Sequence, residues 1–256
     1  MARRRPSLNG PSLACPLYPS YVLRRFLLTP PPRRPLPILR FAAVWLVAVL
    51  ASFWLLACFS LVLFRWVNPP TTAVHIQRHL QAWLHHRPYH PRYDFIPLAE
   101  ISPNLQHAVL AAEDERFYQH HGFDWHAIQL AAEHDVDGGR LRGGSTLTQQ
   151  LVKNLFLGTS RSLLRKAAEA SLVPVAELVL GKRRILELYL NVVEWGPGVY
   201  GAQAASRAWF ATPAARLSRD QAARLAAILP SPLRRRPQRM DHYSAIILDH
   251  MRQLGW

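Results

Sequence analysis

The first residue that could do chemistry is Glu113, in the run AAEDERFYQHHG. It continues an apolar stripe in which Leu105, Val109 and Phe117 recur in steps of four residues. Burial raises the pKa of a carboxyl group toward the range in which it can accept a proton at neutral pH. The alternative is that Glu113 lies at the edge of the stripe with its carboxylate in water, and periodicity alone does not decide between the two.

A second candidate segment is GGSTLTQQLVKN, residues 143–154. Two glycines permit backbone conformations closed to other residues, and a dense set of hydroxyl and amide groups follows them. Such a loop at a helix N-terminus suits an anion or a sugar. A flexible turn before a capped helix explains the same residues equally well. The candidate binding residues are Ser145, Thr146, Gln149, Gln150, Lys153 and Asn154.

The third segment is Arg165-Lys166-Ala167-Ala168-Glu169. Arg165 and Glu169 are four residues apart and could form an ordinary exposed ion pair. Alternatively, Arg165 and Lys166 join Lys153 in a phosphate-binding cluster, with Glu169 holding the cations or helping a metal to bind. Ser-x-x-Lys, Gly-x-Ser-x-Gly and His-Glu-x-x-His motifs do not occur, and no histidine spacing identifies metal ligands.

These residues are expected on helices, and the fold class is predicted to be mainly α. Only a short strand near 93–96 is expected beside them. Pro174 lies in the helix that carries Glu169 and predicts a kink there, because its ring clashes with the preceding turn. Start signals and helical spacing predict helices from Ser102-Pro103 onward, over 162–180 and 184–193, from Ser218 to Pro230, and over 242–254.

Residues 41–64 carry no charge and lie between Arg40 and Arg65. As a helix they would reach roughly 36 Å, enough to cross a bilayer. The arginine-rich segment before them predicts a cytoplasmic N-terminus. A cleaved signal peptide would have a shorter apolar region nearer the start, and a lipoprotein site at Cys58 is disfavoured because the uncharged run continues beyond it. We predict one transmembrane helix.

Composition supports a folded, membrane-anchored protein. The 256 residues carry a net charge of +15, yet half of them are hydrophobic, which excludes a disordered polycation. Both cysteines, Cys15 and Cys58, lie in the N-terminal quarter, so the main domain has no disulfide and no cysteine-based zinc site. The predicted organisation is a disordered, Arg/Pro-rich cytoplasmic tail (1–40), a transmembrane helix (41–64), a juxtamembrane connector (65–92) and one main domain (93–256).

Four motifs together resemble the family 51 glycosyltransferases, the peptidoglycan glycosyltransferases of bacterial cell-wall synthesis. The resemblance covers about residues 93–235, and the absence of a transpeptidase domain indicates the monofunctional branch. The motifs are Glu113-Asp114-x-x-Phe117-x-x-His120-x-Gly122, Gly143-Gly144-Ser145-Thr146-x-Thr148-Gln149-Gln150, Arg165-Lys166-x-x-Glu169 and Ile185-Leu186-Glu187-x-Tyr189-Leu190-Asn191.

The resemblance implies a lysozyme-like helical head with a small membrane-proximal lobe. It also implies a reaction in which the 4-hydroxyl of GlcNAc on lipid II attacks C1 of MurNAc, with inversion and release of undecaprenyl pyrophosphate. Glu113 would be the general base, oriented by Asp114. Glu169 would assist at the pyrophosphate, whose charge Lys153, Arg165 and Lys166 would stabilise, while Ser145, Thr146, Gln149, Gln150 and Asn154 would line the subsites.

The same resemblance sets the expected partners. These are lipid II and the growing lipid-linked glycan, the inner membrane and other cell-wall synthesis proteins, with the catalytic domain outside the cytoplasm and no nucleic acid. No cofactor is required, although Mg²⁺ at the pyrophosphate is plausible. The alternatives are a lysozyme-like lytic or hydrolytic enzyme and a non-catalytic membrane-anchored binding protein.

Overall fold

The structure is a computed structural model that describes residues 36–136, 144–160 and 162–256. The expected cytoplasmic tail, up to residue 35, and Gly143 lie outside the described residues. The chain forms two compact units, Met1–Val49 and Leu50–Trp256. Helix α2 (Leu36–Phe64) crosses the boundary between them, so its two parts are described separately.

Helix α2 has the length and composition of a membrane span. The stretch Leu39–Phe64 is apolar apart from Arg40 and two serines, and few of its side chains are buried. Its C-terminal turns are the exception, because Ala57 and Leu61 are buried in the core of the unit that starts at Leu50. Phe64 stacks on Phe156. The helix therefore ends inside the domain.

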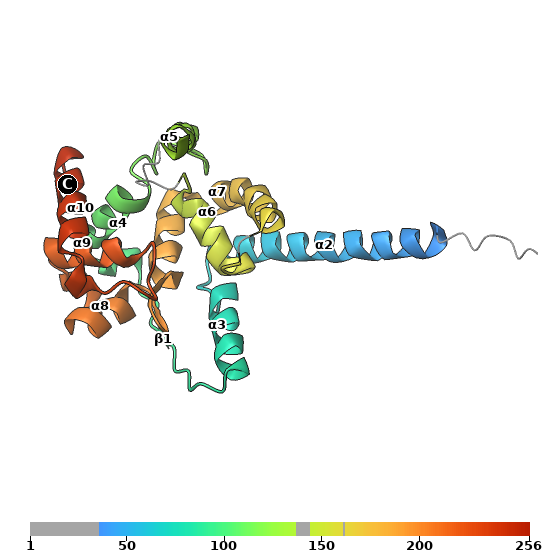
Figure 1. The fold of residues 1–256 in the computed structure, drawn as a ribbon, viewed down its shortest axis with the longest axis horizontal. Coiled ribbons are helices and arrows are strands. Elements are labelled where there is room, and N and C mark those ends of the chain that lie inside the picture. The colour runs from blue at the N-terminus through green and yellow to red at the C-terminus, as the bar shows by residue number, and fades with distance from the viewer. Residues whose placement is uncertain (1–35, 137–143, 161) are drawn as a thin grey trace, which may run out of the picture. The chain divides into compact units, whose positions relative to one another are not determined.

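The second unit is mainly helical, which confirms the predicted fold class (Figure 1). Its α-helices are α3 (Ala73–Leu84), α4 (Pro103–Glu113), α5 (Trp125–Val136), α6 (Leu147–Val152), α7 (Leu163–Val192), α8 (Ala202–Phe210), α9 (Arg219–Ile228) and α10 (Asp241–Gln253). Short turns complete it: η1 (Leu98–Glu100), η2 (Lys153–Leu157), η3 (Ala214–Arg216) and η4 (Pro237–Arg239).

The predicted helix starts are confirmed. Ser102 caps α4 by accepting a hydrogen bond from the Asn104 amide, and Ser218 and Gln221 form the expected capping box of α9. The prediction was wrong for Phe117, which follows the end of α4 instead of continuing its stripe. The chain leaves the helix at Asp114, and Phe117 is buried in the turn that comes next.

Helix α7 contains both helices predicted over 162–180 and 184–193. They are separated by Gly181, whose φ of 71° and ψ of 160° lie outside the helical region. Glycine adopts a positive φ without the steric cost that other residues bear. The backbone at Pro174, where a kink was expected, keeps helical dihedral angles, so the break lies seven residues farther along.

A small sheet joins segments that are far apart in the sequence. Its strands are β1 (Arg92–Tyr93), β2 (Glu194–Gly196) and β3 (Val199–Tyr200), in the order β1-β3-β2. β1 pairs with β3 in parallel, and β2 pairs with β3 antiparallel. The strand expected near 93–96 is confirmed only at its start, and β2 and β3 were not predicted.

The core centres on the second half of α7, where Leu186, Tyr189 and Leu190 are fully buried. α6 packs along α7, while α4 packs against α9 and α10. Hydrogen bonds join the C-terminal end of α4 to α6, from Gln150 to Glu113 and from the Leu147 amide to Asp114. This arrangement brings residue 113 to residues 145–154.

Candidate active site

Glu113 is the last residue of α4 and is only partly exposed. Its Oε2 accepts a hydrogen bond of 2.7 Å from Nε2 of Gln150, which lies on α6. Burial raises the pKa of Glu113 above its ordinary value, against the opposite effects of the Gln150 hydrogen bond and of the charges on Lys153 and Arg235. The carboxylate is therefore suited to accept a proton near neutral pH.

Gln150 is itself fixed by two neighbours. Its Oε1 accepts a hydrogen bond from the Tyr189 hydroxyl at 3.0 Å, and its carbonyl oxygen accepts one from the Asn154 side chain at 2.9 Å. Tyr189 is fully buried. The side-chain oxygen of Gln150 is bonded to Tyr189, so its side-chain nitrogen points at Glu113. The buried Tyr189 thus fixes the orientation of the Gln150 side chain.

Asp114 connects the turn after α4 to the start of α6. Its Oδ2 accepts a hydrogen bond from the Leu147 backbone amide at 2.9 Å, and its Oδ1 lies 2.8 Å from Nε2 of His120. The Gly122 amide donates to His120 Nδ1, which puts the ring proton on Nε2. Asp114 therefore bonds to Leu147 and His120. The expected orienting contact to the Glu113 carboxylate comes from Gln150.

We expect Asp114→Asn to lower the free energy of unfolding by about 1–3 kcal/mol. Both carboxylate oxygens accept hydrogen bonds from buried donors, and an asparagine would turn an NH₂ group toward either Leu147 N or His120 Nε2. The measurement is denaturant unfolding of the purified protein. An unfolding free energy equal to that of the wild type would contradict this structural role.

Thr146 and Gln149 are buried and bonded to each other. Thr146 caps α6 by accepting from the Gln149 amide, and the Gln149 side chain accepts from the Thr146 amide. The Thr146 hydroxyl donates to Gly122 O at 2.6 Å. These two predicted binding residues thus build the turn, and the pattern Thr-x-x-Gln was a readable capping signal.

Glu169, on α7, is only 2% exposed, which excludes the ordinary surface ion pair. Its Oε2 lies 2.7 Å from Nη1 of Arg165, and its Oε1 is bonded to the Lys166 ammonium. Lys166 also lies within 3.5 Å of the Ser145 hydroxyl. The Arg165 Nε is buried and has no hydrogen-bond partner among the described residues.

Lys153 interacts through its charge with the carboxylates of both Glu113 and Glu169. It begins η2, a π-helical turn of the kind often found at functional sites. Burial lowers the pKa of Lys153, as do the charges of Arg165 and Lys166, while Glu169 and Glu113 raise it. Lys153 forms no ion pair among the described residues, so its ammonium is available to a ligand.

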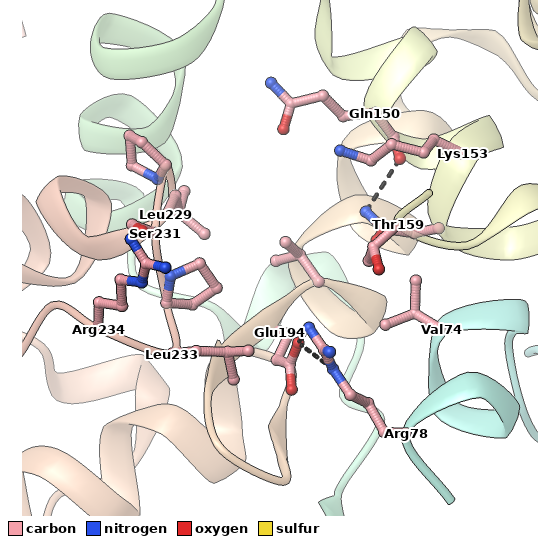
Figure 2. Close-up of a pocket in the computed structure, with 14 residues that line it drawn as sticks. Val74, Arg78, Gln150, Lys153, Thr159, Glu194, Leu229, Ser231, Leu233 and Arg234 are labelled. Carbon is pink, nitrogen blue, oxygen red and sulfur yellow. Dashed lines mark hydrogen bonds and ion pairs between the residues drawn. The ribbon is translucent and has the colours of Figure 1, made fainter. Parts of the chain in front are cut away.

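Beside these residues lies a pocket of about 270 Å³. Gln150 and Lys153 point into it from one side, and the segment from Leu229 to Arg234 forms the facing wall (Figure 2). Asn154 also lines it. Glu113 borders it through Gln150. Arg165, Lys166 and Glu169 do not line this pocket, and they are connected to it through their charge interactions with Lys153.

The lower end of the pocket contains residues that the sequence analysis missed. Arg78 of α3 forms an ion pair with Glu194 of β2 at 2.9 Å, and both line the pocket (Figure 2). His75 packs against Tyr200, and burial lowers the pKa of His75 to about 4, so it is neutral. The signal that could have found α3 is the Thr72 cap, whose side chain accepts from the His75 amide.

In the described part of the chain, Asp114, His120 and Asp124 are close enough to hold a metal ion. Their ligand atoms, however, accept or donate hydrogen bonds within the protein, as Asp124 Oδ1 does from the Ala127 amide. Both oxygens of Glu169 are likewise occupied. These residues do not fit a Mg²⁺ site.

Comparison with known proteins identifies related sequences. A family model described as Transglycosylase matches residues 80–252. The chain is 50% identical over 196 residues to a protein of Pseudomonas putida named biosynthetic peptidoglycan transglycosylase, which covers 75% of this chain and 83% of the relative. A protein of the same name from Pseudomonas aeruginosa is 48% identical, over 75% of this chain and 84% of the relative. Another from Pseudomonas syringae is 46% identical, over 81% of this chain and 90% of the relative.

Proposed function

Because the chain belongs to the transglycosylase family, we propose that it is a peptidoglycan glycosyltransferase that polymerises lipid II into β-1,4-linked glycan strands in cell-wall synthesis. The observation that carries the proposal is that Lys153 lines the same pocket as Gln150, which hydrogen-bonds the Glu113 carboxylate. The charge of Lys153 also interacts with Glu113 and Glu169. A cation in the pocket beside a proton acceptor matches a reaction that deprotonates a hydroxyl and expels a pyrophosphate.

The three cations would stabilise the leaving group. As the bond between MurNAc C1 and the pyrophosphate oxygen breaks, negative charge grows on that oxygen. Lys153, Arg165 and Lys166 supply fixed positive charge there. The buried Arg165 Nε is a donor still available to a phosphate oxygen, and Glu169 holds Arg165 and Lys166 in place from behind.

Glu113 would be the general base. The GlcNAc 4-oxygen forms the new bond to C1 with inversion, its proton passes to Glu113, and undecaprenyl pyrophosphate leaves. Gln150 fixes the base, since its amide is locked by Tyr189. Ser145, Gln150 and Asn154 line the sugar and phosphate subsites, whereas Asp114, Thr146 and Gln149 hold the loop that carries them.

The single membrane anchor, α2, suits this substrate. Both the donor and the acceptor carry a polyprenyl tail, so anchoring the domain beside the bilayer raises the local concentration of the reactants. The proposed arrangement is an inner-membrane protein with its N-terminus in the cytoplasm and residues 65–256 outside. Its partners would be lipid II, the growing glycan and other cell-wall synthesis proteins. Nucleic acid is not among the proposed partners.

We expect a bell-shaped pH dependence of kcat/KM. Glu113 must be ionised, and its raised pKa moves the acid limb above the ordinary carboxyl range. Lys153 must be protonated, and its lowered pKa moves the alkaline limb below the ordinary lysine range. In Lys153→Arg the alkaline limb should disappear while the acid limb stays, because arginine does not titrate there. An acid limb at the ordinary carboxyl pKa would contradict the role of Glu113.

The deciding experiment is incubation of the full-length protein with purified lipid II in detergent. Glycan polymer and released undecaprenyl pyrophosphate are the expected products. A lytic enzyme would leave lipid II unchanged and release fragments from finished sacculi. A binding protein would retain lipid II without forming either product.

A further inference from the structure

A run of arginines follows α9 and begins at the pocket. Four of the six residues from 234 to 239 are arginines, and the chain contains no aspartate or glutamate between Asp220 and Asp241. A run of like charge is usually no more than a solvated surface, so its ion pairs and its position decide whether it can bind a ligand. The run, which we call the arginine ridge, consists of Arg234, Arg235, Arg236 and Arg239.

The acidic residues nearest to the arginine ridge in sequence are bound to another arginine. Asp220 and Asp241 each lie 2.7 Å from a nitrogen of Arg224, which belongs to α9 and not to the ridge. Within the described part of the chain, no ion pair includes a residue of the arginine ridge. The positive charge of the ridge is therefore left without a counter-charge from the protein itself.

Two side chains of the arginine ridge are held in place by contacts that leave their charge intact. Arg235 donates a hydrogen bond to the Ala227 carbonyl oxygen at 2.8 Å, and its guanidinium carbon lies 4.7 Å from the centre of the Tyr243 ring. The guanidinium carbon of Arg236 lies 5.2 Å from the centre of the Trp209 ring. A guanidinium over an aromatic ring stays charged. Because these side chains are already ordered, a ligand would bind them at a lower entropic cost.

The arginine ridge is continuous with the pocket. Arg234 lines the pocket on its facing wall (Figure 2). Arg236 and Arg239, which do not line it, are exposed to solvent. The charge of Arg235 reaches the site as well, since it lowers the pKa of Glu113. Positive charge thus begins in the pocket and continues over the surface outside it.

A ligand for this surface must carry negative charge outside the pocket while its other end is bound inside. The peptide on each disaccharide of the glycan strand fits that description, because a peptide ends in a carboxylate and guanidinium groups pair with carboxylates through two parallel hydrogen bonds. We propose that the arginine ridge binds the peptide carboxylates of lipid II and of the growing strand, an inference that rests on the proposed function. The ridge would hold the saccharide at the pocket and would take no part in the bond-forming step.

The test compares two double variants of the full-length protein in detergent free of phospholipid. Arg234→Gln/Arg239→Gln removes two exposed charges of the ridge. The matched control, Arg216→Gln/Arg219→Gln, removes two exposed charges at the other end of α9, about 15 Å away along the helix. The substrates are lipid II and the same lipid-linked disaccharide without its peptide. Steady-state rates give KM and kcat, and dissociation constants of both lipids are measured in parallel, so the comparison does not require turnover.

The ridge variant is expected to raise KM and the dissociation constant for lipid II about tenfold with kcat unchanged, and to weaken their dependence on salt. The control variant should stay within about twofold of the wild type, and the peptide-free lipid should not distinguish the three proteins. Equal losses with both lipids would overturn the proposal in favour of a pyrophosphate contact. An effect seen only after anionic phospholipid vesicles are added would overturn it in favour of a membrane contact. A wild type that binds lipid II but forms no glycan would contradict the proposed function instead.

Discussion

The Glu113→Gln variant is expected to polymerise lipid II about 10³-fold more slowly than the wild type, with an unchanged fold. The substitution keeps the shape of the side chain, and its amide oxygen can still accept the hydrogen bond from Gln150. It removes the ability to take the proton of the attacking hydroxyl. The effect should therefore fall on kcat, measured as glycan formed per unit time at saturating lipid II.

The matched control is Glu115→Gln, two residues farther along. Glu115 lies 2.7 Å from His250 and takes no part in the pocket. Its rate should stay within about twofold of the wild type, because Glu115 does not line the pocket and glutamine can keep a hydrogen bond to His250. If Glu113→Gln retained a rate within about tenfold of the wild type, Glu113 would not be the general base.

The Glu169→Gln variant is expected to lose about 10²-fold or more in rate, and its pH profile should change. Glu169 is the largest influence that raises the pKa of Lys153. Without that negative charge the pKa of Lys153 falls further, so the alkaline limb of the rate should move to lower pH. A slower enzyme whose alkaline limb stays in place would contradict the coupling of Glu169 to Lys153.

Glu169→Gln should also lower the free energy of unfolding by about 1.5–3 kcal/mol, because it removes the buried charged acceptor from Arg165, whose side chain is 16% exposed, and from Lys166, whose side chain is 43% exposed. The comparison is Asp220→Asn, which breaks the exposed ion pair with Arg224. Both pairs join residues four apart on one helix, but the Asp220 side chain is 56% exposed and the Glu169 side chain is 3% exposed. Denaturant unfolding of Asp220→Asn should show a loss of at most about 1 kcal/mol. Equal losses in the two variants would contradict the burial argument.

Much of the fold could be predicted because its helices have local start signals. Ser102, Ser162 and Ser218 each cap a helix through a hydrogen bond between residues close in sequence. The same locality explains the errors. The end of α4 is set by Asp114, which bonds to Leu147, and no periodic pattern contains a contact across so many residues. Phe117 was therefore misassigned to the helix.

The elements that were missed lack strong patterns. β2 and β3 are only three and two residues long, too short for alternation to be visible. Helix α3 was read as part of a connector because prolines and histidines surround it, although Thr72 caps it.

The candidate site was predicted as residue types, and its assembly came from tertiary structure. The motifs identified Glu113 and Gln150, but the contact between them joins α4 to α6 and depends on the core around Tyr189. The pair of Arg78 and Glu194 joins α3 to β2 and has no motif at all. Sequence patterns therefore named the chemical groups, and the Thr-x-x-Gln pattern also indicated the capping role of Thr146 and Gln149, whereas the contacts between distant elements required the structure.

The way α2 ends has a consequence for how the enzyme responds to its lipid surroundings. Leu61 is buried in the domain, and Arg65 donates to the Val179 carbonyl at 2.7 Å, so no slack segment separates the anchor from α7. A helix in a bilayer of mismatched thickness normally relieves the mismatch by tilting. Here the last turns of α2 are packed in the core and bonded to α7, so they cannot tilt without moving the domain with them.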